Sequence, residues 1–116
     1  MDNIITEKSF QFAVRVVKLC KHLRSSKKEY ILSKQLLRAG TSIGANINEA
    51  IYGNSKADFI SKLHISLKET GESIYWLTLL KRIKLIDYNF DELLSLSEEI
   101  KRMLIASLNT AKEKAK

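Results

Sequence analysis

Residues 32–50 read LSKQLLRAGTSIGANINEA, and their apolar members are spaced as one face of a helix. Leu36, Ala39, Ile43, Ile47 and Ala50 recur at steps of three and four, the period that an amphipathic helix requires. Proline, the strongest helix breaker, is absent from all 116 residues. Helix is therefore predicted not only here but along most of the chain, and no alternating strand pattern competes with it.

Three short polar segments interrupt the helical pattern, at residues 25–28, 53–55 and 87–89. They leave four predicted helices, at about residues 5–24, 33–52, 56–84 and 90–110. Short connections make consecutive helices antiparallel neighbours. The prediction is a single all-α domain over residues 1–116, folded as an up-down-up-down four-helix bundle.

The helix starts are predicted from capping residues. Ser55 precedes Asp58 by three residues and Asn89 precedes Glu92 by three, which marks the starts of the third and fourth helices. The second helix has two possible starts. Ser26 forms a capping box with Glu29, whereas Ser33 has the form of a plain N-cap, and propensity alone does not decide between them.

The chain has more apolar surface than one bundle core needs, because a core-facing helix uses roughly three apolar positions in seven. The first helix has two apolar stripes, and the third carries aromatic residues outside its heptad positions. This pattern predicts burial against other subunits, with Phe59 and Trp76 as candidate interface residues. The alternative is a wide core with the aromatic rings lying flat over it. The two stripes are Phe10, Ala13, Val14, Val17, Cys20 and Phe12, Val16, Leu19, Leu23.

Gly40 and Gly44 lie four residues apart inside the second predicted helix. Each costs the helix roughly 1 kcal/mol relative to alanine. Close approach of a neighbouring helix or subunit is the interpretation that accounts for this cost, and a flexible hinge is the alternative.

Residues 32–50 also resemble the signature of the bacterial four-helix bundle proteins first noticed as reading frames in 23S ribosomal RNA intervening sequences. The likeness continues through residues 55–63 and 65–69, then Glu72 and residues 75–77, and ends near Met103. The resemblance implies an up-down bundle that assembles as a ring, typically a homopentamer, without a known enzymatic activity. A related group is similar to the accessory variability determinant of diversity-generating retroelements, a basic ring that binds nucleic acid and a reverse transcriptase.

The sequence departs from the family pattern at Gly44, where many relatives carry proline, and it lacks prolines before the second helix. These departures leave it undecided whether that helix bends, but they do not change the predicted fold. The resemblance also favours a helix start near Ser33 over Ser26, with residues 27–32 as a loop.

The family likeness singles out five polar positions, which the helical period places along one stripe. A polar stripe in an apolar bundle needs partners, either across helices or across a subunit boundary. The stripe is therefore interpreted as an assembly feature, and a solvated face is the alternative. The positions are Gln35, Arg38, Ser42, Asn46 and Glu49.

Basic residues concentrate where the first and third helices end. In an up-down bundle these ends meet at one pole, together with the acidic Glu29, Asp87, Asp91 and Glu92, and the pole keeps a formal charge of +4. The basic residues are Lys18, Lys21, Arg24, Lys27, Lys28, Lys81, Arg82 and Lys84. The tail adds Lys112, Lys114 and Lys116 at the opposite pole.

A ring of subunits would repeat the basic pole into a belt that suits a polyphosphate chain, so RNA or DNA is the predicted partner. The alternative is that these lysines bind no ligand, because lysines at helix ends interact favourably with the helix dipole and increase solubility. A protein-binding scaffold or adaptor, which would use the outer apolar surface, is the alternative function.

Catalytic and metal-binding patterns are weak. A di-iron bundle needs Glu-x-x-His pairs, and neither His22 nor His64 has a glutamate three residues before it. No catalytic residue, metal site or cofactor is predicted. Arg15 and His22 resemble the Arg/His pair of helical-bundle ribonucleases of the HEPN type, although a solvated face explains both residues.

The cellular setting is predicted from the cysteine content and the apolar runs. Cys20 is the only cysteine and lies on an apolar stripe, which favours a small core residue and excludes an intrachain disulfide. No basic and apolar leader opens the sequence, and the longest apolar run, residues 74–80, is far shorter than the ~20 residues of a membrane span. These features predict a cytoplasmic protein without a membrane partner.

Overall fold

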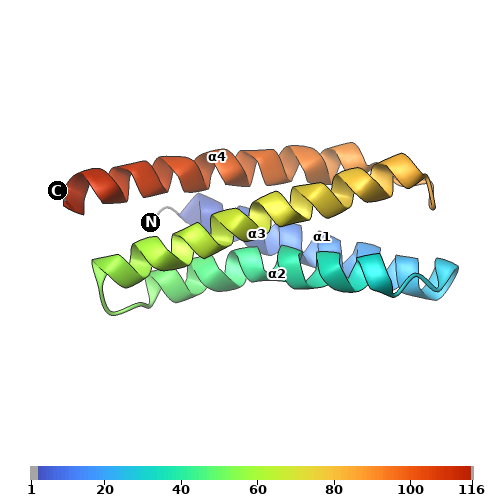
Figure 1. Cartoon of the computed structure of the whole chain (residues 1–116), viewed down its shortest axis with the longest axis horizontal. Coiled ribbons are helices and arrows are strands. Elements are labelled where there is room, and N and C mark those ends of the chain that lie inside the picture. Colours follow the sequence, from blue (N-terminus) through green and yellow to red (C-terminus); the bar gives the residue numbers. More distant parts are fainter. Residues whose placement is uncertain (1–2, 116) are drawn as a thin grey trace.

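The computed structural model describes residues 3–115, which form four helices and no strand. They are α1 (Asn3–Lys27), α2 (Ile31–Ile51), α3 (Lys56–Ile83) and α4 (Phe90–Ala115). The helices run alternately up and down along a rod of 50 × 22 × 20 Å (Figure 1). The all-α prediction with four helices is confirmed, although α1 and α4 extend beyond their predicted ends.

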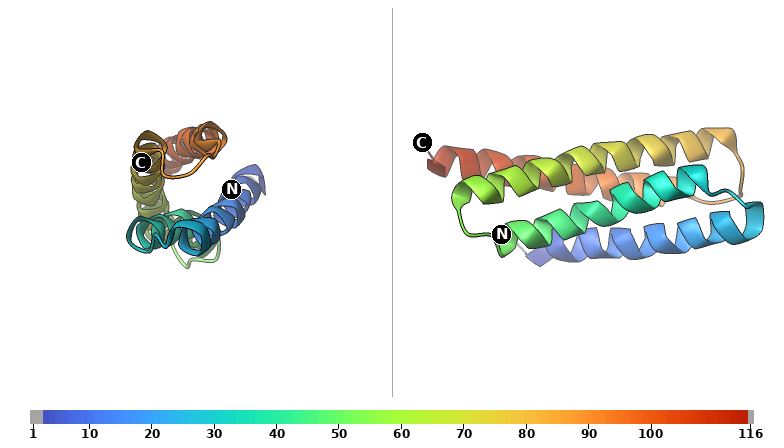
Figure 2. Two further views of the ribbon diagram at one scale, coloured as in Figure 1. Left: turned by 90° about the vertical axis from the view of Figure 1, so that its right-hand side faces the viewer. Right: turned by 60° about the horizontal axis from the view of Figure 1, so that its bottom comes forward.

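The helices pack in chain order around the bundle, and within the described residues the backbones of diagonal helices do not approach each other closely (Figure 2). The contact between α2 and α3 is the most extensive and that between α1 and α4 is the least. Each helix contributes one fully buried stripe to a single core. On α1 this stripe contains Phe12, Val16, Leu19 and Leu23, as its sequence pattern predicted.

The start of α2 differs from both predicted caps. Ser26 lies inside α1, and Ser33 lies within the first turn of α2, where its hydroxyl donates to the Glu29 carbonyl oxygen at 2.8 Å. The Glu29 carboxylate accepts the backbone N–H groups of Ile31, Leu32 and Ser33, at 3.2, 3.1 and 2.8 Å. A carboxylate satisfies free N–H groups and also the positive end of the helix dipole. The connecting loop is therefore only residues 28–30, not 27–32.

The Ser55 cap of α3 is confirmed. Its backbone is extended, with φ −146° and ψ 161°, and its hydroxyl oxygen accepts the Asp58 N–H at 3.0 Å. Helices α1 and α3 end at the other end of the bundle, and neither is followed by a glycine. Lys28 follows α1 with φ 55° and Lys84 follows α3 with φ 53°, both in the left-handed region that favours glycine.

Gly40 and Gly44 let α1 approach α2 closely. A Cβ at position 40 would lie 2.9 Å from a methyl carbon of Val16, and one at position 44 would lie 3.3 Å from the Ser9 hydroxyl oxygen. Helix α2 continues through both glycines. The close-approach interpretation is thus correct, and the neighbour is a helix of the same subunit.

Gly71 is exposed on α3, and a Cβ there would meet no atom within 4 Å. We expect Gly71→Ala to raise the free energy of unfolding by about 1 kcal/mol, because it removes the backbone entropy cost of glycine in a helix. Gly40→Ala is the matched control, since overpacking against Val16 should cancel or reverse that gain. Urea denaturation of both variants measures the difference, and equal stabilisation would contradict the close packing of α1 on α2.

Candidate functional site

The ends of α1 and α3 and the starts of α2 and α4 lie at one end of the bundle, which we call the basic end (Figure 1). The left view of Figure 2 looks onto this end. The structure therefore brings together the basic residues predicted for one pole, with Lys18 and Lys21 about two turns back along α1. Lys112 and Lys114 lie in the last turn of α4 at the other end, and Lys116 lies outside the described residues.

Few of these cations are neutralised by a neighbour. Lys81 Nζ lies 2.6 Å from an Asp91 carboxylate oxygen, and Arg24 Nε donates to the Ser33 hydroxyl at 3.2 Å. The six others form no ion pair with any residue in the range 3–115, which leaves them available to an anionic partner. They are Lys18, Lys21, Lys27, Lys28, Arg82 and Lys84.

A hollow of about 360 Å³ lies beside the basic end, between α1 and the segment before α4. Arg15, Lys18, Leu19 and His22 line one side and Tyr88 lines the other. The two residues of the ribonuclease-like pattern therefore share one site. One Arg15 guanidinium nitrogen pairs with Glu92 at 2.8 Å, and His22 Nδ1 lies 3.1 Å from the Ser26 hydroxyl oxygen.

Sequence reasoning missed Tyr88. An aromatic residue in a predicted turn was the only signal, and only the fold shows that this turn returns to the middle of the basic stripe on α1.

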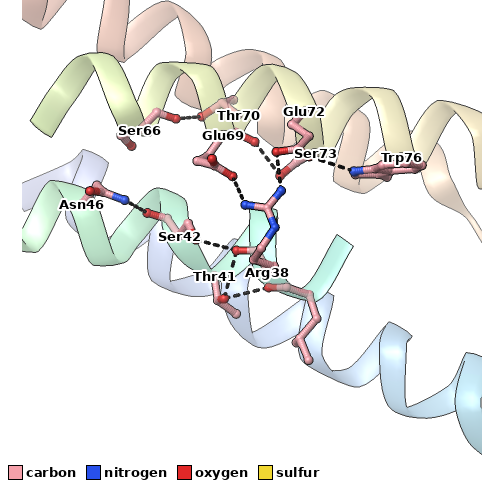
Figure 3. A network of polar contacts seen from close by, with 11 residues as sticks. Arg38, Thr41, Ser42, Asn46, Ser66, Glu69, Thr70, Glu72, Ser73 and Trp76 are labelled. Carbon is pink, nitrogen blue, oxygen red and sulfur yellow. Dashed lines mark hydrogen bonds and ion pairs between the residues drawn. The ribbon is translucent and has the colours of Figure 1, made fainter. Parts of the chain in front are cut away.

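Four of the five residues of the polar stripe on α2 have partners inside the protomer, and Figure 3 shows three of them, Arg38, Ser42 and Asn46. Arg38 bridges to α3, with guanidinium nitrogens 3.0 Å from a Glu69 oxygen and 2.5 Å from a Glu72 oxygen. Ser42 donates to the Arg38 carbonyl and Asn46 to the Ser42 carbonyl. Glu49 pairs with Lys62 of α3 at 3.2 Å, and Gln35 is partly buried. The stripe therefore pairs its charges without a second subunit, and its role in assembly stays a prediction.

The Arg38 cluster has a clear electrostatic asymmetry. The Glu69 side chain is only 7% exposed, whereas that of Arg38 is half exposed. The hydrogen bond from Arg38 lowers the pKa of Glu72, and the hydrogen bond from Trp76 acts in the same direction. The same pairing raises the pKa of Arg38. The cluster therefore favours the charged form of Glu72 and bonds the buried Glu69 carboxylate to the same guanidinium.

Exposed apolar side chains occur on all four helices, and α1 carries a group of them that lie along one face. Phe59 and Trp76 are partly buried and pack against the protomer's own core, as the wide-core alternative expected for such rings. Phe10, by contrast, is 66% exposed, and Val14 and Val17 are exposed on the same face. Beside Phe10 lies a hollow of about 380 Å³ between α1 and α2, which is lined by Thr6, Ser9, Phe10, Ala13, Thr41, Gly44, Ala45 and Asn48.

Cys20 is a buried core residue. Its thiol donates to the Ser33 carbonyl oxygen at 3.3 Å, and burial raises its pKa to about 11. Residues 3–115 contain no group of three or more His, Cys, Asp or Glu side chains that could hold a metal ion. No helix in the described part of the chain combines the length and the apolar character that crossing a membrane requires.

Comparisons with known proteins agree with this architecture. A protein of unknown function from the S23 ribosomal protein family of Bacteroides thetaiotaomicron has a similar crystal structure, with a TM-score of 0.86 and 48% sequence identity. The match covers 90% of this chain and 97% of that one. No curated protein matches the sequence. The model of the 23S rRNA-intervening sequence protein family matches residues 1–106. The chain therefore belongs to the 23S rRNA-intervening sequence protein family.

Proposed function

We propose that the protein is a non-enzymatic, ring-forming homo-oligomer, a pentamer in the family pattern, that binds RNA or DNA through its basic end. The observation that carries the proposal is the set of six cations at this end without an acidic partner among residues 3–115. Phosphate contacts by lysine and arginine supply most of the affinity of proteins that bind nucleic acid without sequence preference.

The backbone at the basic end supports the same proposal. A non-glycine residue in the left-handed region is uncommon and costs about 1 kcal/mol or more, and glycine is the usual residue there. Both described residues of this kind are lysines, Lys28 and Lys84, and both lie at the basic end. A lysine at such a position adds charge at a cost in stability, which a role in binding accounts for.

Assembly is supported by the exposed face of α1. Phe10, Val14 and Val17 follow steps of four and three, so they form one continuous apolar stripe on the surface. Contact of this stripe with a second copy would remove it from water, and a closed ring would repeat the basic end around one face. Repeating the basic end in this way strengthens the positive electrostatic field that attracts a polyanion.

The substitution Lys28→Gly/Lys84→Gly separates binding from folding. Glycine fits the left-handed backbone, so the free energy of unfolding should stay unchanged or rise by up to about 1 kcal/mol per site. Affinity for nucleic acid should fall at the same time. On duplex DNA, the slope of log affinity against log salt should decrease by roughly 0.9 for each phosphate contact removed. Fluorescence anisotropy across a salt series measures both quantities.

Lys112→Ala/Lys114→Ala is the matched control, because it removes the same charge at the opposite end of the bundle. It should change the salt slope much less. Equal effects of the two double variants would show that only net charge matters, and would exclude the basic end as the binding surface. Binding of a partner protein that survives both double variants but fails on truncation of an exposed apolar residue would favour the scaffold function.

A further inference from the structure

The hollow between α1 and Tyr88 combines an aromatic ring, an apolar floor and cationic walls. Leu19, at the floor, is 2% exposed. The Tyr88 ring is partly buried and packs edge-on against Phe90, with centroids 4.8 Å apart and planes at 63°. This contact fixes the ring before any ligand arrives. A fixed, partly exposed ring beside an apolar surface suits another flat ring.

The opposite wall carries donors for an anion. Arg15, Lys18 and His22 follow steps of three and four on α1, so they share one face of the helix. Glu92 occupies only one nitrogen of the Arg15 guanidinium, which carries five N–H donors. Lys18 forms no ion pair with any of residues 3–115, and His22 uses only Nδ1 in its described contact with Ser26. The volume of about 360 Å³ lies within the range of small-ligand pockets.

We propose that this hollow is a subsite for one unstacked nucleotide of a single-stranded nucleic acid, with the base on Tyr88 and the adjoining phosphate on Lys18 and Arg15. This inference rests on the proposed function and adds strand selectivity to it. Bases in a duplex are stacked on their neighbours and cannot reach a side-chain ring, whereas a single strand presents them freely. Lys21, about one turn further along α1, forms no ion pair with any described residue and continues the basic surface beyond the hollow.

The test compares a fluorescently labelled single-stranded DNA with the blunt duplex made from it, using the full-length chain. Removal of a stacking side chain typically weakens single-strand binding by about tenfold or more. Tyr88→Leu should therefore lose about tenfold on the single strand and little on the duplex, because leucine keeps apolar packing against Phe90 but offers no ring. Tyr88→Phe is the matched control and should bind both DNAs as the wild type does. Thermal unfolding of both variants verifies the fold.

Other variants and probes separate the subsite from the basic end. Lys28→Gly/Lys84→Gly should weaken binding of both DNAs alike, since it removes contacts to the backbone. If Tyr88→Leu binds the single strand as tightly as the wild type while the lysine variant loses affinity, the subsite is wrong and the proposed function stands. If the wild type binds neither DNA nor the single-stranded and duplex RNAs of the same sequence, both are wrong. Thymidine monophosphate should compete only weakly with the strand, and strong competition would instead mark a site for free nucleotides.

Discussion

Phe10→Gln/Val17→Gln should convert an oligomer into a monomer of 13.3 kDa without weakening the fold. Both side chains are exposed in the protomer, at 66% and 38%, so their replacement removes no core contact. If they lie at a subunit boundary, each loses a desolvated apolar contact, and such anchor residues contribute on the order of 2 kcal/mol or more to an interface. Light scattering of wild type and variant at equal concentration measures the mass directly.

Loss of assembly should also cause a large loss of affinity for nucleic acid. A strand that contacts several basic ends at once gains an effective concentration, which raises overall affinity by roughly 10²–10⁴-fold without new contacts. The monomeric variant should therefore bind a long nucleic acid at least about 100-fold more weakly, although its basic end is unchanged. Glutamine adds no charge, so electrostatic repulsion does not explain such a loss.

Tyr75→Gln is the matched control for this experiment. Tyr75 is 61% exposed and lies on α3, the helix diagonal to α1 in the bundle. The control should keep both the mass and the affinity of the wild type. If the wild type has the mass of one protomer, the proposed ring and its repeated basic ends are both wrong. The exposed stripe on α1 would then have no second copy to cover it.

The bundle was predictable because its determinants are local in sequence. Helical periods, the absence of proline and the Ser55 cap each depend on residues within one or two turns of each other. The start of α2 was not predictable in the same way. Glu29 competes with two serines for the role of cap, and only the path of the chain after α1 places its carboxylate against three N–H groups.

The candidate site was predictable only in part, for a related reason. The topology alone gathers the lysines at one end, so the basic end followed from the order of the helices. The hollow required the packing of the segment before α4 against α1, which brings Tyr88 near Arg15, 73 residues earlier in the chain. Likewise, the outward position of Phe10 and the inward packing of Trp76 depend on how each helix is rotated about its axis.

Arg38→Met should be among the most destabilising substitutions of a half-exposed residue in this chain. Methionine keeps an apolar stem but leaves the Glu69 carboxylate, 7% exposed, without its guanidinium partner. Loss of one partner from a buried pair costs roughly 3–5 kcal/mol, and the exposure of Arg38 lowers the expected cost to about 2 kcal/mol. Chemical denaturation at neutral pH measures this loss.

Two further measurements identify the carboxylates as the cause. Glu69→Gln in the Arg38→Met background should recover part of the lost stability, because a neutral amide is cheaper to bury than an unpaired charge.

The pH dependence of stability should follow from Glu72, whose pKa Arg38 holds below its ordinary value of 4.5. A lowered pKa in the folded state contributes stability that is present above the unfolded pKa and is lost as the pH falls through the folded pKa. The wild-type advantage over Arg38→Met should accordingly be full at neutral pH and shrink below about pH 4.5. An advantage that stays constant through that range would mean that Arg38 stabilises α2 against α3 by packing alone.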